Sequence, residues 1–274
     1  MKHGSQTVGI VGDSGAMGKW LRAFFEGLGF RVIGSSLFSS ALSNRQLVKL
    51  SDVVIFSVTL SEMVPVIQSL VPYSRPEQLW MDVGSRKKNI MDAMLESSAE
   101  VVGLHPLCAP PQGVALEGET VVRCCQARLN RWIGWVDWIL LQMKARVVSC
   151  DPSFHDEMML LTQNLPQAST IALAMALAGS GRTPGEMLKF STTASRASLI
   201  LIAKMLANTP EVYADIQVGN PDGIAALDEL IRSLVLVRRL ASQRKSDEIV
   251  TILKDLRAYF GEDFIAAGKK GFVR

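Results

Sequence analysis

The sequence predicts two domains: an α/β domain with a doubly wound parallel sheet over residues 1–150, and an all-helical domain over residues 151–274. Length supports this division, because 274 residues exceed one ordinary core and suit two domains. Composition supports globular cores, since 48% of the residues are apolar and 20% are charged. The spacing of apolar residues alternates between strand and helix patterns in the first half and is helical in the second.

Short β-branched runs alternate with helical patterns up to residue 150. We expect strands over residues 7–11, 31–35, 53–58, 79–83, 101–104, 120–124 and 146–149. Helices are expected over residues 17–28, 62–70, 88–97 and 130–143. Strands that alternate with helices predict parallel pairing through helical crossovers, with ligands at the carboxyl ends of the strands.

The pattern beyond Asp151 is helical throughout. Long helices are expected over residues 153–179, 185–207, 222–242 and 246–259. Several are apolar around most of their circumference, as at residues 199–202. One exposed domain buries less apolar surface than this, so we expect a homodimer formed through the helical domain. A large core within one chain is the alternative.

Residues 7–18 predict a dinucleotide site, because a strand, a glycine turn and a helix start follow one another there with the spacing GxxGxxG. Gly15 would let the backbone approach a pyrophosphate, and Gly18 would let the helix pack closely on the sheet. The first half is therefore predicted to be Rossmann-like. The expected cofactor contacts are Gly12, Asp13, Ser14, Gly15, Ala16, Met17, Ser35, Ser36, Val58 and Thr59.

The end of the second predicted strand bears on the choice of dinucleotide. An acidic residue usually contacts the ribose there in NAD-selective domains, and this sequence has none. Ser35 and Ser36 stand in its place and could donate to a 2′-phosphate, with Arg45 the nearest arginine that follows them. The sequence therefore slightly favours NADP as the cofactor. NAD stays an alternative if the two serines are only loop residues.

Charge and terminal sequence argue against several other classes. Lys and Arg exceed Asp and Glu by 29 to 26 without a basic run, so no nucleic-acid partner is expected. Residues 1–6 lack a signal-peptide pattern and no apolar stretch is long enough to span a bilayer, which predicts a cytoplasmic protein without a membrane partner. The four cysteines lack metal-ligand spacing, so no metal site is expected.

Successive blocks of the chain resemble those of the prephenate dehydrogenase family. They are residues 8–32, residues 52–58, Asp82-Val83-Gly84-Ser85, Gly103-Leu104-His105-Pro106-Leu107 and His155-Asp156, and the likeness continues through residues 210–216. The GxxGxxG variant occurs in one branch of that family and in its amino-deoxyprephenate relatives. The resemblance implies a dehydrogenase of aromatic or tyrosine biosynthesis. Such an enzyme oxidises a cyclohexadienol with NAD(P) and releases the ring carboxylate as carbon dioxide.

The resemblance also implies the catalytic residues. His105 would accept a hydrogen bond from the substrate hydroxyl and assist its deprotonation, and Ser85 would orient His105. An imidazole suits this task because its unperturbed pKa is about 6.5. Independently of the family, His105 ends a predicted strand, where open α/β sheets bind ligands. His155 is expected to satisfy N–H groups or carboxylates at the start of the first helix of the second domain.

The residues expected to bind substrate depart from the family pattern. Prephenate carries two carboxylates, which call for cationic or amide partners. Lys204 stands where the family usually has arginine, and Arg196, eight residues earlier, can lie on the same helix face or form a salt bridge. Gln167 stands where many relatives have histidine, and Gln163 is expected in the same site. Prephenate, arogenate and 4-amino-4-deoxyprephenate therefore all remain candidate substrates.

Two other functions share parts of this pattern. An NADP-dependent β-hydroxyacid or imine dehydrogenase has the same fold plan, but residues 153–179 lack the lysine that the hydroxyacid enzymes use. A dinucleotide-binding regulatory protein without catalysis is disfavoured by Ser85 and His105, while Lys204 keeps that alternative open. No mutase module is expected before Thr7 and no regulatory module after Arg274, which predicts a protein with a single activity.

Overall fold

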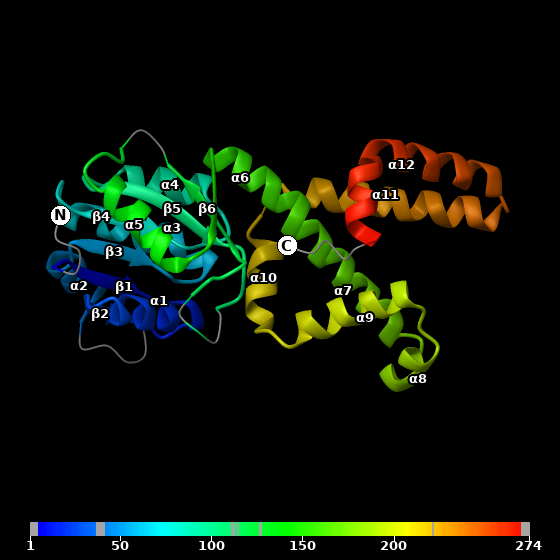
Figure 1. The fold of residues 1–274 in the computed structure, drawn as a ribbon, viewed down its shortest axis with the longest axis horizontal. Coiled ribbons are helices and arrows are strands. Elements are labelled where there is room, and N and C mark those ends of the chain that lie inside the picture. Colours follow the sequence, from blue (N-terminus) through cyan, green and yellow to red (C-terminus); the bar gives the residue numbers. More distant parts are fainter. Residues whose placement is uncertain are drawn as a thin grey trace. The chain divides into compact units, whose positions relative to one another are not determined.

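The computed structural model describes residues 5–36, 42–110, 113, 115–125, 128–220 and 222–269. It divides into two compact units, Met1–Pro221 and Asp222–Arg274. The first unit contains the sheet and the helices up to α10, and the second contains α11 and α12 (Figure 1). The boundary predicted after residue 150 lies inside the first unit.

A seven-stranded sheet forms the centre of the first unit, in the order β2-β1-β3-β4-β5-β6-β7. The strands are β1 Thr7–Val11, β2 Arg31–Ser35, β3 Val53–Phe56, β4 Leu79–Asp82, β5 Glu100–Pro106, β6 Thr120–Cys124 and β7 Arg146–Cys150. All neighbours are parallel except β5 and β6. The predicted parallel sheet is thus confirmed except at this one pair, where the described residues between β5 and β6 contain no helical crossover.

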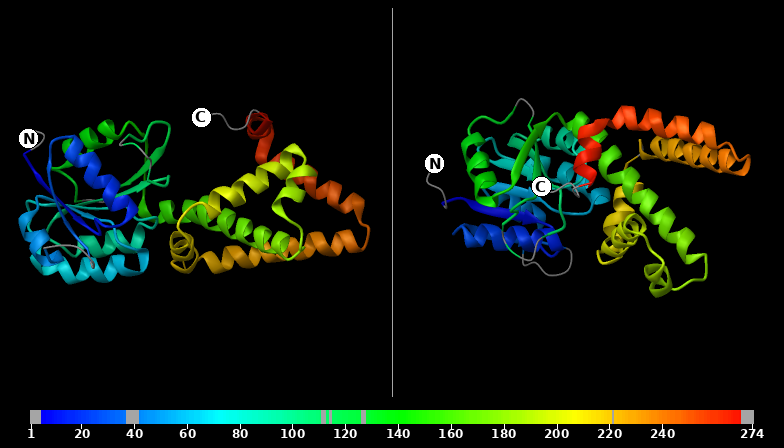
Figure 2. Two further views of the ribbon diagram at one scale, coloured as in Figure 1. Left: turned by 90° about the horizontal axis from the view of Figure 1, so that it is seen from below. Right: turned by 45° about the vertical axis from the view of Figure 1, so that its right-hand side comes forward.

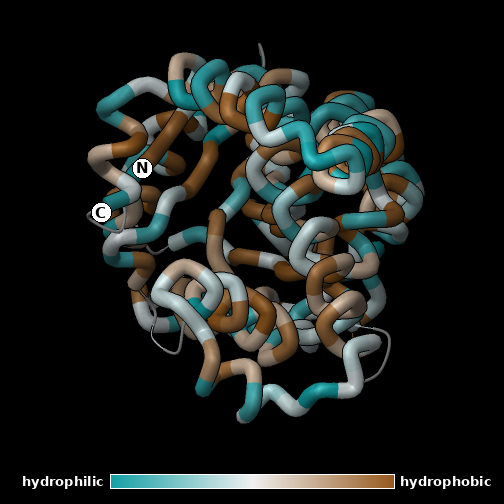
Figure 3. Tube along the Cα trace, turned by 90° about the vertical axis from the view of Figure 1, so that its right-hand side faces the viewer, coloured by the Kyte–Doolittle hydropathy of each residue, from teal (hydrophilic) through white to brown (hydrophobic). Residues whose placement is uncertain are grey.

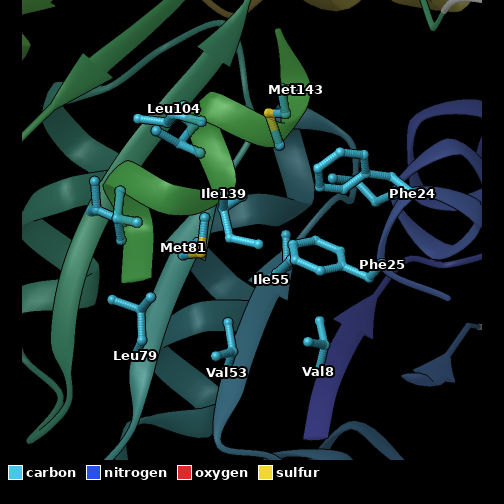
Figure 4. Packing of buried hydrophobic residues seen from close by; sticks show 14 of the residues in the cluster. Val8, Phe24, Phe25, Val53, Ile55, Leu79, Met81, Leu104, Ile139 and Met143 are labelled. Atoms are coloured by element: carbon cyan, nitrogen blue, oxygen red, sulfur yellow. The ribbon is translucent and has the colours of Figure 1, made fainter. Parts of the chain in front are cut away.

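Helices cover both faces of the sheet, so the doubly wound fold is confirmed. The helices of this part are α1 Ala16–Gly27, α2 Asn44–Leu50, α3 Leu60–Leu70, the short 3₁₀ turn Val71–Tyr73, α4 Lys88–Leu95 and α5 Ile133–Met143. One face packs against α1 and α5, and the other packs against α2, α3 and α4. Figure 4 shows Phe24 and Phe25 of α1, and Ile139 of α5, among the strand residues of the first face.

The chain after β7 is helical, as predicted, but its breaks differ. The elements are α6 Pro152–Met159, the π-helical turn Leu160–Asn164, α7 Leu165–Ala178, α8 Pro184–Lys189, α9 Thr193–Leu206 and α10 Pro210–Val218. The helix predicted over residues 153–179 therefore contains a π turn, a feature that is frequent at functional sites. The helix predicted over residues 185–207 is two helices, and α10 was not predicted. Figure 2 shows α7 and α9 side by side.

The second unit is a pair of packed helices, α11 Gly223–Ser242 and α12 Ser246–Lys269. The predicted end of the last helix, residue 259, is too early, because the chain kinks at Gly261, which has a φ of 76°, and then continues as helix. Brown, hydrophobic stretches recur along the helices of the chain (Figure 3). Within the described residues, none of the helices is long and apolar enough to cross a membrane.

Candidate active site

The glycine turn after β1 has the geometry that a dinucleotide site needs. Gly12 has a φ of 91°, and a side chain there would collide with the backbone of Ser57 and with Val58. A side chain at Gly18 would collide with the backbone of Gly12, so α1 can approach this closely only with glycine at that position. Gly15 is the N-cap of α1 and makes no side-chain cap, which leaves the first N–H groups available to a phosphate.

The other predicted cofactor residues surround this turn. Ser14, Gly15 and Ala16 are exposed, while Asp13, Met17 and Val58 are half-buried. Thr59 is exposed and is the N-cap of α3. The residues that lie at the turn can therefore hold a dinucleotide phosphate through backbone N–H groups.

The two serines expected to contact the cofactor at the end of β2 differ in their exposure. Ser35 is buried and only 1% exposed, whereas Ser36 is half-buried. Arg45 lies over the ring of Tyr73, 4.4 Å from its centre. The cation beside β2 is instead Arg22, which binds Asp13 at 2.6 Å and lies against Gly34. A cation in α1 had not been predicted for this position.

A chain of three side chains joins β5 to α6. His105 Nδ1 lies 2.9 Å from His155 Nε2, and His155 Nδ1 lies 2.8 Å from Asp156 Oδ1. His105 and His155 are only 5% and 1% exposed. Asp156 also accepts the backbone N–H groups of Lys87 and Lys88, at 2.7 and 3.0 Å. The sequence had predicted His155 beside carboxylates, but not its contact with His105.

A buried ion pair lies beside these three hydrogen-bonded side chains. Lys87 and Asp82 are both fully buried, and the Lys87 ammonium binds the Asp82 carboxylate. The backbone N–H of Gly84 donates to the same carboxylate at 2.9 Å. Full burial raises the pKa of Asp82, although Lys87 acts in the opposite direction. The pair places the Lys87 ammonium close enough to His105 to affect the pKa of that ring.

Burial determines which groups are charged here. It lowers the pKa of His105 well below its ordinary value of 6.5, and the charge of Lys87 and the neighbouring His155 act in the same direction. Burial alone would raise the pKa of Asp156, but its hydrogen bonds from His155, Lys88 and Lys87 outweigh burial and hold that pKa below its usual range. His105 is therefore a neutral base at physiological pH, and Asp156 is an anion.

A small pocket opens next to these groups within the first unit. Its polar lining comes from the loop after β4, from α6 and the π turn, and from the residues that follow α10. These residues are Ser85, Arg86, Asp156, Gln163, Asn164 and Asn220. The Arg86 guanidinium binds the carbonyl oxygen of Gly219, and its Nε is buried without a hydrogen-bond partner in the described part of the chain. The pocket therefore contains a cation that the sequence had not predicted.

The predicted substrate residues are only partly brought together. Ser85 and Gln163 line the pocket, although no hydrogen bond joins Ser85 to His105 among the described residues. Gln167 lies on α7, with its Oε1 atom buried and unpartnered within the described ranges. Lys204 and Arg196 share helix α9, as expected, but both are exposed and neither lines the pocket.

A metal centre is not evident in the part of the chain that the structure describes. No group of three or more His, Cys, Asp or Glu residues with metal-binding geometry occurs there. The side chains that meet at this site are a neutral histidine, an anion behind it and a cation in the adjoining pocket.

Two models of one family match successive parts of the chain. The model described as "Prephenate dehydrogenase, nucleotide-binding domain" matches residues 37–149. The model described as "Prephenate dehydrogenase, dimerization domain" matches residues 151–255. Both matches agree with the order of blocks recognised in the sequence.

Individual relatives share about a quarter of their aligned residues with this chain. The chain is 25% identical over 280 residues to the "Probable arogenate/prephenate dehydrogenase" of Methanocaldococcus jannaschii. That alignment covers 96% of this chain but 63% of the relative. It is 26% identical over 278 residues to the 4-amino-4-deoxyprephenate dehydrogenase of Streptomyces pristinaespiralis. That alignment covers 92% of this chain and 90% of the relative. The chain thus spans less than two thirds of the archaeal relative's length.

Solved structures share the fold. Prephenate dehydrogenase from Aquifex aeolicus, in complex with hydroxyphenyl propionate and NAD+, superposes with a TM-score of 0.71 at 21% identity, over 94% of this chain and 98% of that one. Synechocystis arogenate dehydrogenase gives a TM-score of 0.65 at 19% identity, over 92% and 98%. Because the two family models together account for most of the sequence, the chain belongs to the prephenate dehydrogenase family.

Proposed function

We propose that this protein oxidises prephenate or a close cyclohexadienyl analogue and decarboxylates it to an aromatic 4-hydroxyphenyl or 4-aminophenyl product, with a nicotinamide dinucleotide as hydride acceptor. The observation that carries the proposal is His105, a buried neutral base at the carboxyl end of β5. The same edge of the parallel strands bears the glycine turn that suits a dinucleotide. Family membership supports the combination.

His105 moves the proton in this reaction. It accepts a hydrogen bond from the hydroxyl on the substrate ring and takes up that proton while the hydroxyl carbon becomes a carbonyl. The bond from the ring to its carboxylate breaks, carbon dioxide leaves, and the electron pair enters the ring. The oxygen then takes the proton back from His105, so the step releases an aromatic hydroxyl and no net proton.

The nicotinamide cofactor, when bound, accepts the hydride that leaves the hydroxyl carbon. Gly12 and Gly15 would allow its pyrophosphate to approach the N-terminus of α1, where no side chain caps the free N–H groups. Ser14, Ala16 and Met17 adjoin that turn, and Val58 faces Gly12. We propose NADP as the preferred dinucleotide, because β2 ends without an acid and Arg22 lies beside it.

The substrate carboxylates need cationic or amide partners. Arg86 and Gln163 line the pocket near His105, since Ser85 and Arg86 follow β4, and Asp82 of β4 pairs with Gly103 of β5. We therefore assign one carboxylate to Arg86, whose planar guanidinium can bind it in a bidentate manner. Lys204, Arg196 and Gln167 remain predicted partners for the rest of the substrate.

The remaining expectations are part of the same proposal. We expect a homodimer through the helical residues from 151 onwards, where apolar side chains such as Leu201, Leu206 and Met175 are exposed. The functional domain boundary is proposed near Asp151, where the dimerization-domain match begins.

The function is tested by mixing the purified protein with prephenate, arogenate or 4-amino-4-deoxyprephenate, each with NAD and with NADP. Formation of reduced nicotinamide is followed by its absorbance. We expect turnover with one of these acids, and the Glu157→Gln variant, which changes an exposed carboxylate of α6, should behave as wild type. The absence of reduction in every combination would rule the proposal out.

The cofactor assignment predicts the effect of Ser36→Asp. An aspartate at the end of β2 repels a 2′-phosphate and can accept a hydrogen bond from a free ribose hydroxyl. The variant should therefore bind NADP more weakly and spare NAD, which fluorescence titration of both reduced dinucleotides measures. Unchanged binding of both would show that Ser36 does not contact the ribose.

Two substitutions compare the proposed cations. Because a charge-assisted hydrogen bond contributes about 1.5 to 3 kcal/mol, Arg86→Met should raise the KM for the substrate at least about tenfold and leave cofactor affinity unchanged. Lys204→Met should also raise KM, whereas Lys204→Arg should preserve or improve activity on prephenate by restoring the bidentate fork. An unchanged KM in either Met variant would remove that residue from the substrate site.

A further inference from the structure

We propose that His155 and Asp156 position His105 as a base by fixing its tautomer: the proton of neutral His105 stays on Nδ1, and Nε2 keeps the lone pair that faces the substrate. The inference rests on the proposed function of His105 and extends it to two residues of α6. Both residues act through His105 in this account, and Asp156 also lines the adjoining pocket.

The argument starts at Asp156, which can only accept hydrogen bonds because it is ionised. Two of its donors are fixed, the backbone N–H groups of Lys87 and Lys88 at 2.7 and 3.0 Å. Helix α4 has no side-chain cap of its own, so this carboxylate caps the helix and is stabilised there as an anion. The third contact, His155 Nδ1 at 2.8 Å, must therefore also be a donor.

The next step concerns His155. A neutral imidazole has one donor and one acceptor nitrogen, so a proton on Nδ1 leaves Nε2 as an acceptor. His155 Nε2 lies 2.9 Å from His105 Nδ1. His105 must then donate from Nδ1, and its own Nε2 becomes the acceptor. In the described residues, Nε2 of His105 has no hydrogen-bond partner, so it is available to the substrate hydroxyl.

In the proposed arrangement both rings are neutral, and the physical reason is their burial. His155 is 1% exposed and His105 is 5% exposed, so a second proton on either ring would be a buried charge. The ammonium of Lys87 further disfavours a second proton on His105, because its charge lowers the pKa of that ring. The charged groups that face the pair are thus Lys87, Asp82 and Asp156.

The hydrogen bonds from His105 through His155 to Asp156 also support the proton transfer itself. When His105 takes the substrate proton, it becomes an imidazolium, and its Nδ1–H bond to His155 then becomes charge-assisted. His155 is in turn bonded to the Asp156 anion, which stabilises the positive charge across two hydrogen bonds. His155 and Asp156 therefore contribute most when the proton has moved, which affects kcat more than KM.

The tautomers can be measured directly on the free wild-type protein. The chain has three histidines, His3, His105 and His155, so a long-range ¹H–¹⁵N spectrum of histidine-labelled protein contains three ring systems. His105→Asn and His155→Gln assign the two buried rings. At neutral pH we expect His105 and His155 each to carry one proton, on Nδ1. A proton on Nε2 of His105, or a doubly protonated His155, would overturn the proposal.

Two substitutions test the role in catalysis. In His155→Gln the side-chain oxygen lies four bonds from Cα, as His155 Nε2 does, and can still accept from His105; in His155→Asn the side chain is too short. Loss of the hydrogen-bond partner behind a metal-bound histidine typically costs about 10- to 100-fold in activity, and we expect the same range for His105. We expect His155→Asn to lose kcat in this range with little change in KM, and His155→Gln to retain more of it. Equal losses in both variants, or none, would contradict the proposal.

The outcomes separate this inference from the proposed function. The spectrum is recorded without substrate, so the predicted tautomers can be found in a protein that acts on none of the three acids. Conversely, an active enzyme with its His105 proton on Nε2 would retain the proposed function and refute the positioning by His155. Glu157→Gln, on the exposed side of α6, should leave both the spectrum and kcat unchanged.

Discussion

Replacing His105 with asparagine should lower kcat by about 10² to 10⁴, the range attributed to general acid–base catalysis. The asparagine amide reaches about as far as Nδ1 and can still donate to His155, while the Nε2 atom that accepts the substrate proton is removed. The glycine turn at Gly12 is not altered, so cofactor affinity should stay near the wild-type value. Steady-state kinetics and a dinucleotide titration measure the two effects.

The pH profile adds a second readout for the same substitution. Burial and the charge of Lys87 hold the pKa of His105 well below 6.5, so the neutral, active form persists into acid solution. For the wild type we expect kcat/KM to fall only as the pH drops through this lowered pKa. The variant should lack that limb of the profile. Wild-type turnover by His105→Asn would exclude His105 as the base.

Asp82→Asn should destabilise the protein by about 3 to 5 kcal/mol, the usual cost of breaking a buried ion pair by neutralising one partner. The amide keeps the size of the side chain and can still accept from Gly84, but Lys87 is left as a buried charge without an anion. The free energy of unfolding in urea measures this cost.

Two further variants show whether the unpaired charge is the cause. Asp82→Leu combined with Lys87→Met removes both charges and should be more stable than Asp82→Asn. Glu117→Gln breaks the exposed pair with Lys144, whose side chains are 70% and 62% accessible, and should change stability little. A stability loss in Asp82→Asn no larger than that of Glu117→Gln would show that the buried pair does not matter for folding.

The order of strands and helices around the sheet could be predicted because its signals are local. Gly12, Gly15 and Gly18 fall within one turn and helix start, and apolar β-branched runs mark each strand. The antiparallel pairing of β5 with β6 could not be predicted from such runs, since a strand pattern carries no direction. Helix α2 is only seven residues long and depends on a capping box between Ser43 and Gln46, a signal too short for periodicity.

The candidate site was predicted in part. His105 lies at the carboxyl end of β5, Ser85 follows β4, and Gln163 of the π turn lines the pocket. The contact between His105 and His155 joins residues fifty positions apart, so spacing could not indicate it. Asp156 follows His155 directly, and its position near the start of a helix was the only local signal of a hydrogen-bonding role.

The arginines show the same limit. Arg45 is close to Ser36 in sequence but stacks on Tyr73, whereas Arg22 approaches β2 from helix α1. Arg86 lies directly after Ser85, and its adjacency to a predicted catalytic residue could have marked it as a pocket residue. Whether a long side chain turns inward depends on contacts such as the Gly219 carbonyl, which comes from a distant segment.

The central claim is that reduction of the nicotinamide and loss of the ring carboxylate are one reaction in this protein. It is tested most directly by measuring both products together, with the acid from the substrate panel that gives turnover labelled in its ring carboxylate. The account predicts one labelled carbon dioxide for each reduced dinucleotide, with both products formed about 10² to 10⁴ times more slowly by His105→Asn. Reduced dinucleotide without labelled carbon dioxide would contradict it and would indicate simple alcohol oxidation.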